Sequence, residues 1–200
     1  MKFLDPVVPE KIARSRLHRR RFGRVGSLIR SSARLWRRHG VGKAQAVRPE
    51  SGQRRLPYLE VLWLPSYRVQ LEVVRGDTAV TIETLVGGNE RTFAVCDFSE
   101  SPWRDSVGHD HFSATINERE ARAIATQGLC ESLLRRRGWG RKFTIRPTVS
   151  TELVQYPYWV YYFARRGDKL DFRMLDALTG KPVGAKMKVS LLSALRNKDR

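Results

Sequence analysis

A chain of 200 residues with 41% hydrophobic content can form one ordinary domain plus a tail, or two very small domains. Its 38 Lys and Arg residues against 20 Asp and Glu residues give a net charge of +18, which predicts a polyanionic partner: nucleic acid, an anionic membrane surface or an acidic protein. The two cysteines, Cys96 and Cys130, form no CxxC pair, which argues against a disulfide scaffold or a zinc site and favours a reducing compartment.

The first quarter of the chain carries most of the excess charge. Residues 1–56 contain 16 Lys and Arg and three acids, whereas residues 57–200 contain 22 bases and 17 acids. We therefore expect a basic N-terminal arm with its linker over 1–56, and an α+β globular domain over 57–200. Residues 41–55 have no apolar periodicity and are typical of a linker, so folded structure is expected to begin near Leu56.

Within the arm, the segment from Glu10 to His39 is rich in arginine and has a moderate amphipathic pattern, weakened by Gly23 and Gly26. Three interpretations stay open: a poorly ordered tail, an arm that orders along nucleic-acid phosphates, and a membrane-surface helix or organellar transit peptide. The predicted polyanion contacts in this segment are Arg19, Arg20, Arg21, Arg24, Arg30, Arg34, Arg37 and Arg38.

The N-terminus lacks the continuous apolar core of a secretory signal peptide. The longest uncharged run in the aromatic region, Leu153 to Ala164, has 12 residues, fewer than the ~20 that a transmembrane helix needs. We expect a cytoplasmic protein or one peripheral to a membrane.

Two segments of the expected domain have similar patterns. A shift of 92 positions aligns residues 61–88 with 153–180 without a gap, and each reads as an apolar strand containing a proline, a charged turn, a second strand and a Gly turn. This predicts an internal repeat of two related β-rich halves. It also matches Val80 and Ile82 with Phe172 and Met174 on the inner side of the second strands.

The repeat divides the aromatic strand YPYWVYYF into two faces, because successive side chains of a strand point to opposite sides. In the first copy Tyr67, Val69, Leu71 and Val73 form an apolar face, and the alternate residues are polar. In the second copy Trp159, Tyr161 and Phe163 then lie on the core face. The other face, with Tyr156, Tyr158 and Tyr162, needs a cover, which is either a helix of this chain or a partner.

Two helices are expected. One spans about 117–137, with a capping box at its start, Gly138 after its end, and a buried stripe at Ala121, Ile124, Ala125, Leu129 and Leu133. A shorter helix is expected at about 188–197. With strands at 78–86 and 170–176 and shorter ones at 92–97 and 142–147, the fold class is α+β, with a mainly antiparallel sheet, one long helix and one short helix.

No pattern of catalytic residues emerges. His109 and His111 have a spacing that could bind a metal on a strand, but they lie in a segment rich in Ser, Gly and Asp with no third ligand at a recognisable spacing. No phosphate-binding loop of the GxxxxGK[ST] type is present. The sequence therefore predicts no enzyme, no metal and no cofactor.

The stretch RRRGWGRKF is the better binding candidate of the domain, since bases there alternate with aromatic side chains at a helix C-terminus. The alternative is a helix cap whose Trp139 folds back onto the core. The predicted contacts are Arg135, Arg136, Arg137, Arg141 and Lys142 for a polyanion and Trp139 for a partner.

The segment YPYWVYYFARRGDKLDFRMLDALTGKPVG resembles PepSY-like small β-rich modules over roughly 35 residues. The D-x-x-T-G turn at Asp176, Thr179 and Gly180 carries this resemblance. It implies a binding or structural role rather than catalysis and transfers no catalytic residue. PepSY-like modules are often extracytoplasmic or membrane-associated, and no matching export signal accompanies the segment.

Together these features predict a non-catalytic structural or adaptor component of a larger assembly, which docks through the basic arm and an aromatic and basic surface. The expected partners are a polyanion and a protein, with no small-molecule substrate. Two alternatives are an RNA- or DNA-binding protein that uses phosphate contacts, and a peripheral protein at an anionic membrane surface.

Overall fold

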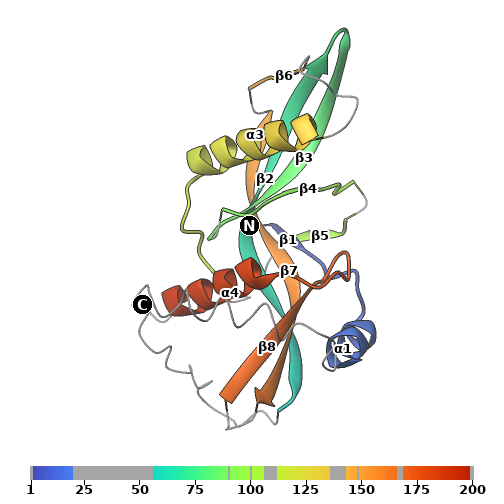
Figure 1. Cartoon of the computed structure of the whole chain (residues 1–200), viewed down its shortest axis with the longest axis vertical. Coiled ribbons are helices and arrows are strands. Elements are labelled where there is room, and N and C mark those ends of the chain that lie inside the picture. The colour runs from blue at the N-terminus through green and yellow to red at the C-terminus, as the bar shows by residue number, and fades with distance from the viewer. Residues whose placement is uncertain are drawn as a thin grey trace.

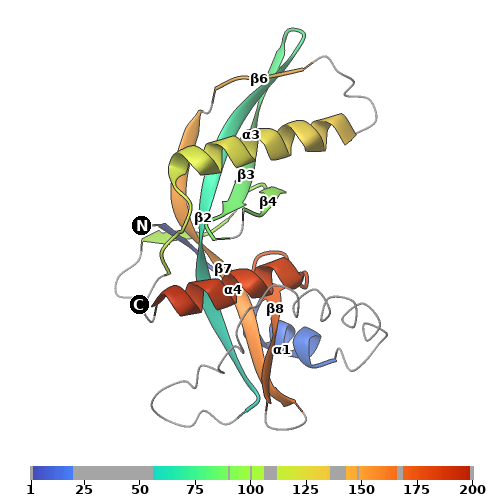
Figure 2. The ribbon, with the colours of Figure 1, turned by 60° about the vertical axis from the view of Figure 1, so that its left-hand side comes forward.

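A computed structural model describes residues 2–19, 56–89, 91–99, 101–105, 112–135, 143–147, 149–165 and 169–198. These residues form a mixed, mostly antiparallel sheet with three helices around it (Figures 1 and 2). The α+β class is therefore confirmed. In chain order the elements are β1 (Lys2–Leu4), α1 (Glu10–Arg19), β2 (Tyr58–Arg75), β3 (Thr78–Gly87), β4 (Phe93–Val95), β5 (Trp103–Asp105), α3 (Glu118–Arg135), β6 (Thr144–Ile145), β7 (Ser150–Arg165), β8 (Lys169–Asp176) and α4 (Ala185–Lys198).

The two long strands β2 and β7 form the spine of the molecule. They pair antiparallel from Tyr58 opposite Tyr162 to Gln70 opposite Ser150. Strand β3 pairs with the upper part of β2 in Figure 1, and β8 pairs with the lower part of β7. The short strands β4 and β6 extend the upper part, and β1 pairs in parallel with the middle of β7 and antiparallel with β5.

The upper part of the sheet packs against α3. Directly opposite residues of β2 and β7 share a face, so Tyr67, Val69, Leu71 and Val73 lie on one side of the pleat. All four are buried, and the helix contributes the buried stripe Ala121, Ala125, Leu129 and Leu133 to the same cluster, with Ile124 partly buried beside it. The predicted apolar face and the predicted helix stripe are both confirmed.

The aromatic strand β7 is covered on both faces of the lower part. On one face Trp159 and Tyr161 are buried with Ala13 and Leu17 of α1. On the other face Tyr156, Tyr158 and Tyr162 are 4%, 6% and 7% exposed and pack with Leu191 and Ala194 of α4. These three tyrosines are thus not a surface open to a partner, because α4 supplies the helical cover that the sequence analysis weighed as the alternative.

The first residues of the chain belong to the fold, although folded structure was expected to begin near Leu56. Phe3 and Leu4 of β1 have no exposed surface, and α1 packs on β7 and β8. The prediction was wrong for residues 2–19 because two apolar residues, Phe3 and Leu4, and the i, i+4 pair Ala13 and Leu17 are enough to fold this segment when a sheet is available to bury them. Residues 20–55, which contain the rest of the expected arm and linker, lie outside the described residues.

The two β-hairpins of the predicted repeat lie side by side, but their second strands do not match. Val73 lies opposite Val80, which puts Val80 and Ile82 on the α3 face of the sheet. Tyr162 lies opposite Phe172, which puts Phe172 and Met174 on the α4 face. The reason is the turn: residues 76–77 connect β2 to β3 and residues 166–168 connect β7 to β8, and a one-residue difference reverses the faces of the following strand.

The helices lie on the same two faces as these residues of the second strands: α3 covers one face of the sheet and α4 covers the opposite face. In Figure 1 both cross in front of the strands, because the long β2–β7 pair twists between them.

Candidate polyanion-binding site

Most of the predicted contact residues fall outside the described part of the chain. These are Arg20, Arg21, Arg24, Arg30, Arg34, Arg37, Arg38, Arg136, Arg137, Trp139, Arg141 and Lys142. His109 and His111, which were not predicted to bind a metal, lie outside it as well. Arg19 is the last residue of α1, and nothing is described of its side chain. Arg135 ends α3, is exposed, and pairs with Glu131 at 3.5 Å. Within the described ranges no group of three or more His, Cys, Asp or Glu side chains could hold a metal ion.

The candidate site in the described residues is α1, which packs against the sheet along one side. Ala13 and Leu17, one turn apart, are 0% and 3% exposed against Trp159 and Tyr161. The segment before the helix is fixed by main-chain hydrogen bonds, since the amides of residues 7 and 8 both donate to the Ala177 carbonyl. The Trp159 indole N–H donates to the Val8 carbonyl at 2.8 Å.

Two arginines connect the helix to β8 and to the turn that follows it. The Arg16 guanidinium donates to the Gly180 carbonyl at 2.8 Å, and the Arg173 guanidinium donates to the Leu17 carbonyl at 2.8 Å. The second bond satisfies a carbonyl in the last turn of α1, where a cation is also favourable for the helix dipole. These two cations therefore hold the helix in place.

The D-x-x-T-G turn forms the support for Arg16. The Asp176 carboxylate accepts hydrogen bonds from the amides of Leu178 and Thr179, and the Gly180 amide donates to the Asp176 carbonyl. Gly180 has a φ of +68°, and a Cβ atom there would come within 2.1 Å of the Arg16 guanidinium. The backbone conformation therefore favours glycine, and any larger residue would also displace the Arg16 guanidinium.

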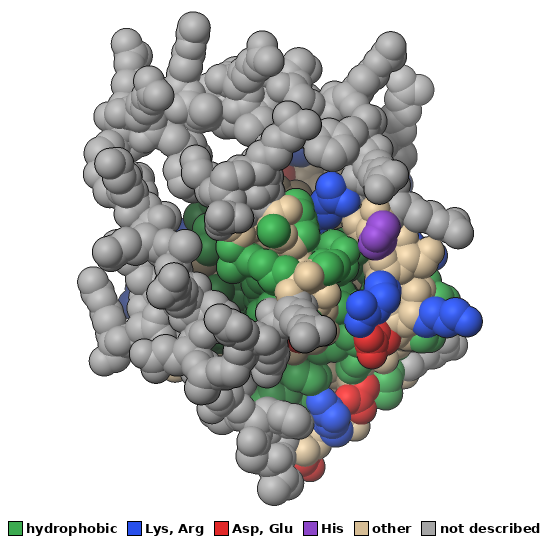
Figure 3. All heavy atoms as spheres, turned by 90° about the horizontal axis from the view of Figure 1, so that it is seen from below, with side chains coloured by type: hydrophobic (Ala, Val, Ile, Leu, Met, Phe, Trp, Pro, Cys, Tyr) green, Lys and Arg blue, Asp and Glu red, His purple; other side chains and the backbone are tan. Residues whose placement is uncertain are grey.

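The outward side of α1 presents hydrogen-bond donors. Lys11, Arg14, Ser15 and His18 follow one another at i, i+3, i+4 and i+7, which places them on one stripe of the helix, and they line a shallow hollow. We call these four residues the donor stripe. Arg14 also pairs with Glu10 at 2.9 Å, at the N-terminal end of the stripe. Figure 3 shows basic side chains and a histidine on one side of this end of the molecule.

A row of aromatic rings continues from the C-terminal end of the stripe. The exposed His18 ring lies 6.4 Å from the Tyr161 ring, and Tyr161 and Phe163 are stacked at 6.0 Å with an interplanar angle of 28°. The Arg173 guanidinium lies over Phe163 at 5.0 Å. Because Arg173 also bonds Leu17, it fixes the rings and the helix relative to each other.

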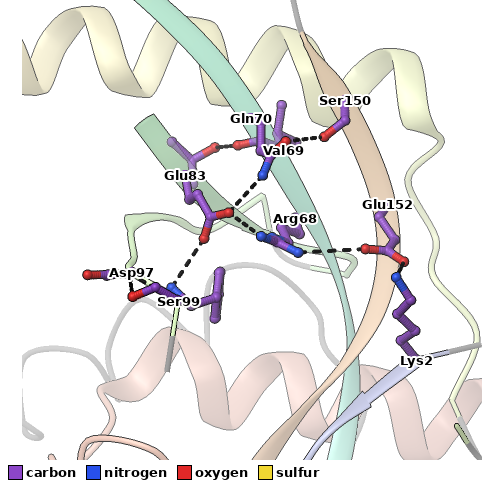
Figure 4. A network of polar contacts seen from close by, with 11 residues as sticks. Lys2, Arg68, Val69, Gln70, Glu83, Asp97, Ser99, Ser150 and Glu152 are labelled. Carbon is purple, nitrogen blue, oxygen red and sulfur yellow. Dashed lines mark hydrogen bonds and ion pairs between the residues drawn. The ribbon is translucent and has the colours of Figure 1, made fainter. Parts of the chain in front are cut away.

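A second polar cluster lies on the upper part of the sheet, on the face opposite α3 (Figure 4). Glu83 accepts hydrogen bonds from Arg68, Gln70 and the Phe98 amide. Burial alone would raise the pKa of Glu83, but these donors hold it below its usual value. Glu152 links Arg68 to Lys2 of β1. These ion pairs and hydrogen bonds connect β2, β3, β7 and β1, although the buried Nε of Arg68 has no hydrogen-bond partner among the described residues, so the main role of the cluster is to join strands.

The lower core contains a thiol and two phenols near a carboxylate. The Tyr156 hydroxyl donates to Asp176 at 3.0 Å. Burial raises the pKa of the Cys96 thiol to about 11, and burial likewise raises the pKa of Tyr156 and of Tyr158. A thiol that stays protonated at neutral pH is a poor nucleophile, so this cluster serves packing.

The donor stripe was not among the predicted contacts. The sequence analysis placed Lys11, Arg14 and His18 in a continuous basic arm. Within such an arm, nothing distinguishes one basic residue from another as a contact. The spacing of Ala13 and Leu17 was the available signal, since it separates an inward side from an outward side over residues 10–19. Because the pattern covers only two buried residues, it could not show that residues 10–19 form a helix packed on the sheet.

Comparison with known proteins returned no match, whether to protein-family models, curated proteins or solved structures. In the part of the chain that is described, no helix combines the length and apolar character required to cross a membrane.

Proposed function

We propose that the protein is a non-catalytic structural or adaptor component of a larger assembly, and that it docks onto a polyanionic partner through the donor stripe of α1 and the basic segment that follows it. The observation that carries the proposal is the two-sided construction of α1. Its apolar side and Arg16 are committed to the sheet, while Lys11, Arg14, Ser15 and His18 face outward.

Fixing the helix favours binding because less conformational freedom is lost when a partner arrives. A flexible basic tail must order its backbone on contact, whereas the donor stripe is held at a constant spacing before contact. Arg19, Arg20 and Arg21 follow the stripe directly in the sequence, and five further arginines lie between residues 24 and 38. Their charge would steer an anionic partner toward α1.

Of the partners considered from the sequence, an anionic bilayer is the least supported by α1. A membrane-surface helix inserts its apolar side between lipids. In α1 that side, with Ala13 and Leu17, is buried against β7. We propose a protein that is cytoplasmic or peripheral to a membrane by charge rather than by insertion.

The test measures binding of the full chain to a long polyphosphate at about 50 and 200 mM salt. The charge-reversed variant K11E/R14E is compared with R119E/K186E, which changes the net charge equally at exposed positions of α3 and α4. Two lost attractions of about 1 kcal/mol each correspond to about thirty-fold weaker binding by K11E/R14E. Equal losses in both variants would show that net charge alone attracts the polyanion, and would refute a docking site on α1.

A further inference from the structure

We propose that the polyanion bound at α1 is a single-stranded nucleic acid, with its phosphates on Lys11, Arg14 and Ser15 and a base stacked on His18. This inference rests on the proposed function and names the chemistry of its partner. It combines the two features of the site that the proposed function leaves separate, the donor stripe and the row of rings.

The donor stripe fits a phosphate chain in composition and length. Ammonium, guanidinium and hydroxyl groups are the usual protein donors to phosphate oxygens. From Lys11 to His18 the helix rises about 10 Å, which is longer than a single phosphate group. The stripe therefore matches a short run of consecutive phosphates rather than one isolated anion.

The rings offer a stacking contact for a base, which a chain of phosphates without bases could not use. Single-stranded nucleic acids are bound by cationic grooves beside aromatic side chains on which bases stack, and histidine is among these side chains. His18 is exposed, and the buried Tyr161 ring lies behind it at 6.4 Å. Tyr161 is stacked with Phe163, which lies under Arg173, so the His18 ring lies at a tilt of 59° beside a fixed group of rings.

The same geometry distinguishes single strands from the other polyanions. In a duplex the faces of the bases are covered by neighbouring base pairs, so a duplex offers phosphates to the stripe but no free base to His18. An acidic protein segment or an anionic vesicle offers negative charge without a nucleobase. The proposal therefore predicts an order of affinity and makes His18 the residue that sets it.

The experiment measures fluorescence anisotropy of the full chain with a labelled mixed-sequence single-stranded RNA. Competitors are the duplex of that sequence, polyphosphate of equal charge, an acidic peptide of equal charge, and phosphatidylserine-containing vesicles. His18→Gln removes the ring and keeps hydrogen-bonding groups, and His18→Tyr keeps a ring. We expect His18→Gln to weaken binding of the single strand about five-fold or more, to change binding of polyphosphate less than two-fold, and His18→Tyr to retain the affinity.

Salt dependence tests the phosphate contacts separately. Each lost phosphate contact lowers the slope of log K against log salt by about 0.7 for a single strand, so K11Q/R14Q should lower it by about 1.4. The matched neutralisation R119Q/K186Q should leave the slope unchanged, because these side chains lie on other helices.

The outcomes separate this inference from the proposed function. If polyphosphate binding depends on Lys11 and Arg14 but His18→Gln has no effect on the single strand, the docking site stands and the nucleic-acid inference is overturned. Tighter binding of the duplex, the acidic peptide or the vesicles than of the single strand would overturn it as well. If neither charge variant differs from its control, both proposals fail.

Discussion

Leu17→Ala tests whether α1 is part of the cooperative fold. Leu17 is 3% exposed and packs with Trp159, Tyr161 and Leu175 beneath the helix. Alanine at this position removes the side chain beyond Cβ and leaves a cavity against the two aromatic rings. The helix itself is not weakened by the exchange, because alanine has the highest intrinsic helix propensity.

The expected loss can be worked from the atoms removed. Three buried carbon groups at about 0.8 kcal/mol each give about 2.4 kcal/mol of lost transfer free energy, and the cavity adds to it, so we expect about 3 kcal/mol within the usual range of 2–5. If α1 detached before the rest unfolded, the loss would be limited to the free energy with which α1 docks.

Urea unfolding followed by tryptophan fluorescence measures the effect as a change in midpoint at constant m-value. Ile12→Ala is the matched control, because Ile12 lies on the same helix and is 44% exposed, so its change should stay within about 0.5 kcal/mol. A loss below about 0.5 kcal/mol for Leu17→Ala would refute the burial of α1 against β7 and, with it, the fixed donor stripe.

Two further predictions concern titratable groups. Since the pKa of Glu83 is lowered in the folded protein, its contribution to stability is present above its unfolded pKa and is lost as pH falls through the folded value. The free-energy gap between wild type and Glu83→Gln should therefore be about 1–3 kcal/mol at pH 7 and shrink below about pH 4.5, whereas the exposed Glu131→Gln should cost less than about 0.5 kcal/mol throughout. A pH-independent gap for Glu83→Gln would contradict the ion-pair account. Cys96, with its pKa raised to about 11, should be about one part in a thousand thiolate at pH 8 and react slowly with a disulfide reagent in a Cys130→Ser background. Labelling as fast in buffer as in urea would show that Cys96 is not buried as described.

The parts of the fold that the sequence predicted are those with a repeated local pattern. Alternating apolar and polar residues predicted the buried face of β2, with Val69, Leu71 and Val73. The helical spacing of apolar residues predicted the buried stripe of α3. Both predictions succeeded because each pattern repeats several times. The α4 helix was expected over 188–197 and spans Ala185–Lys198. Its role as the cover of Tyr158 was one of two alternatives, since a sequence shows that a face needs a cover but not which element supplies it.

The missed parts depend on neighbours that lie far away in the chain. Strand β1 has three residues and no period, and it is a strand only because β7 and β5 lie on either side of it. The registers of the two hairpins depend on the number of turn residues, and an ungapped alignment cannot detect that difference. The matching of Val80 with Phe172 failed for this reason.

Both faces of β7 carry aromatic side chains that need a cover. One of these covers is itself part of the basic region, so the basic N-terminal residues also contribute to the stability of the fold. The face with Tyr158 is covered by α4, but the face with Trp159 and Tyr161 is covered by α1, the start of the most basic region of the chain. Removing residues 1–55 to delete the charge would also remove β1 and expose Trp159. Loss of binding by such a truncated chain would therefore have two causes, a missing site and a damaged core. Single changes on the outward side of α1 leave Ala13 and Leu17 in place, so only they can assign binding to the donor stripe.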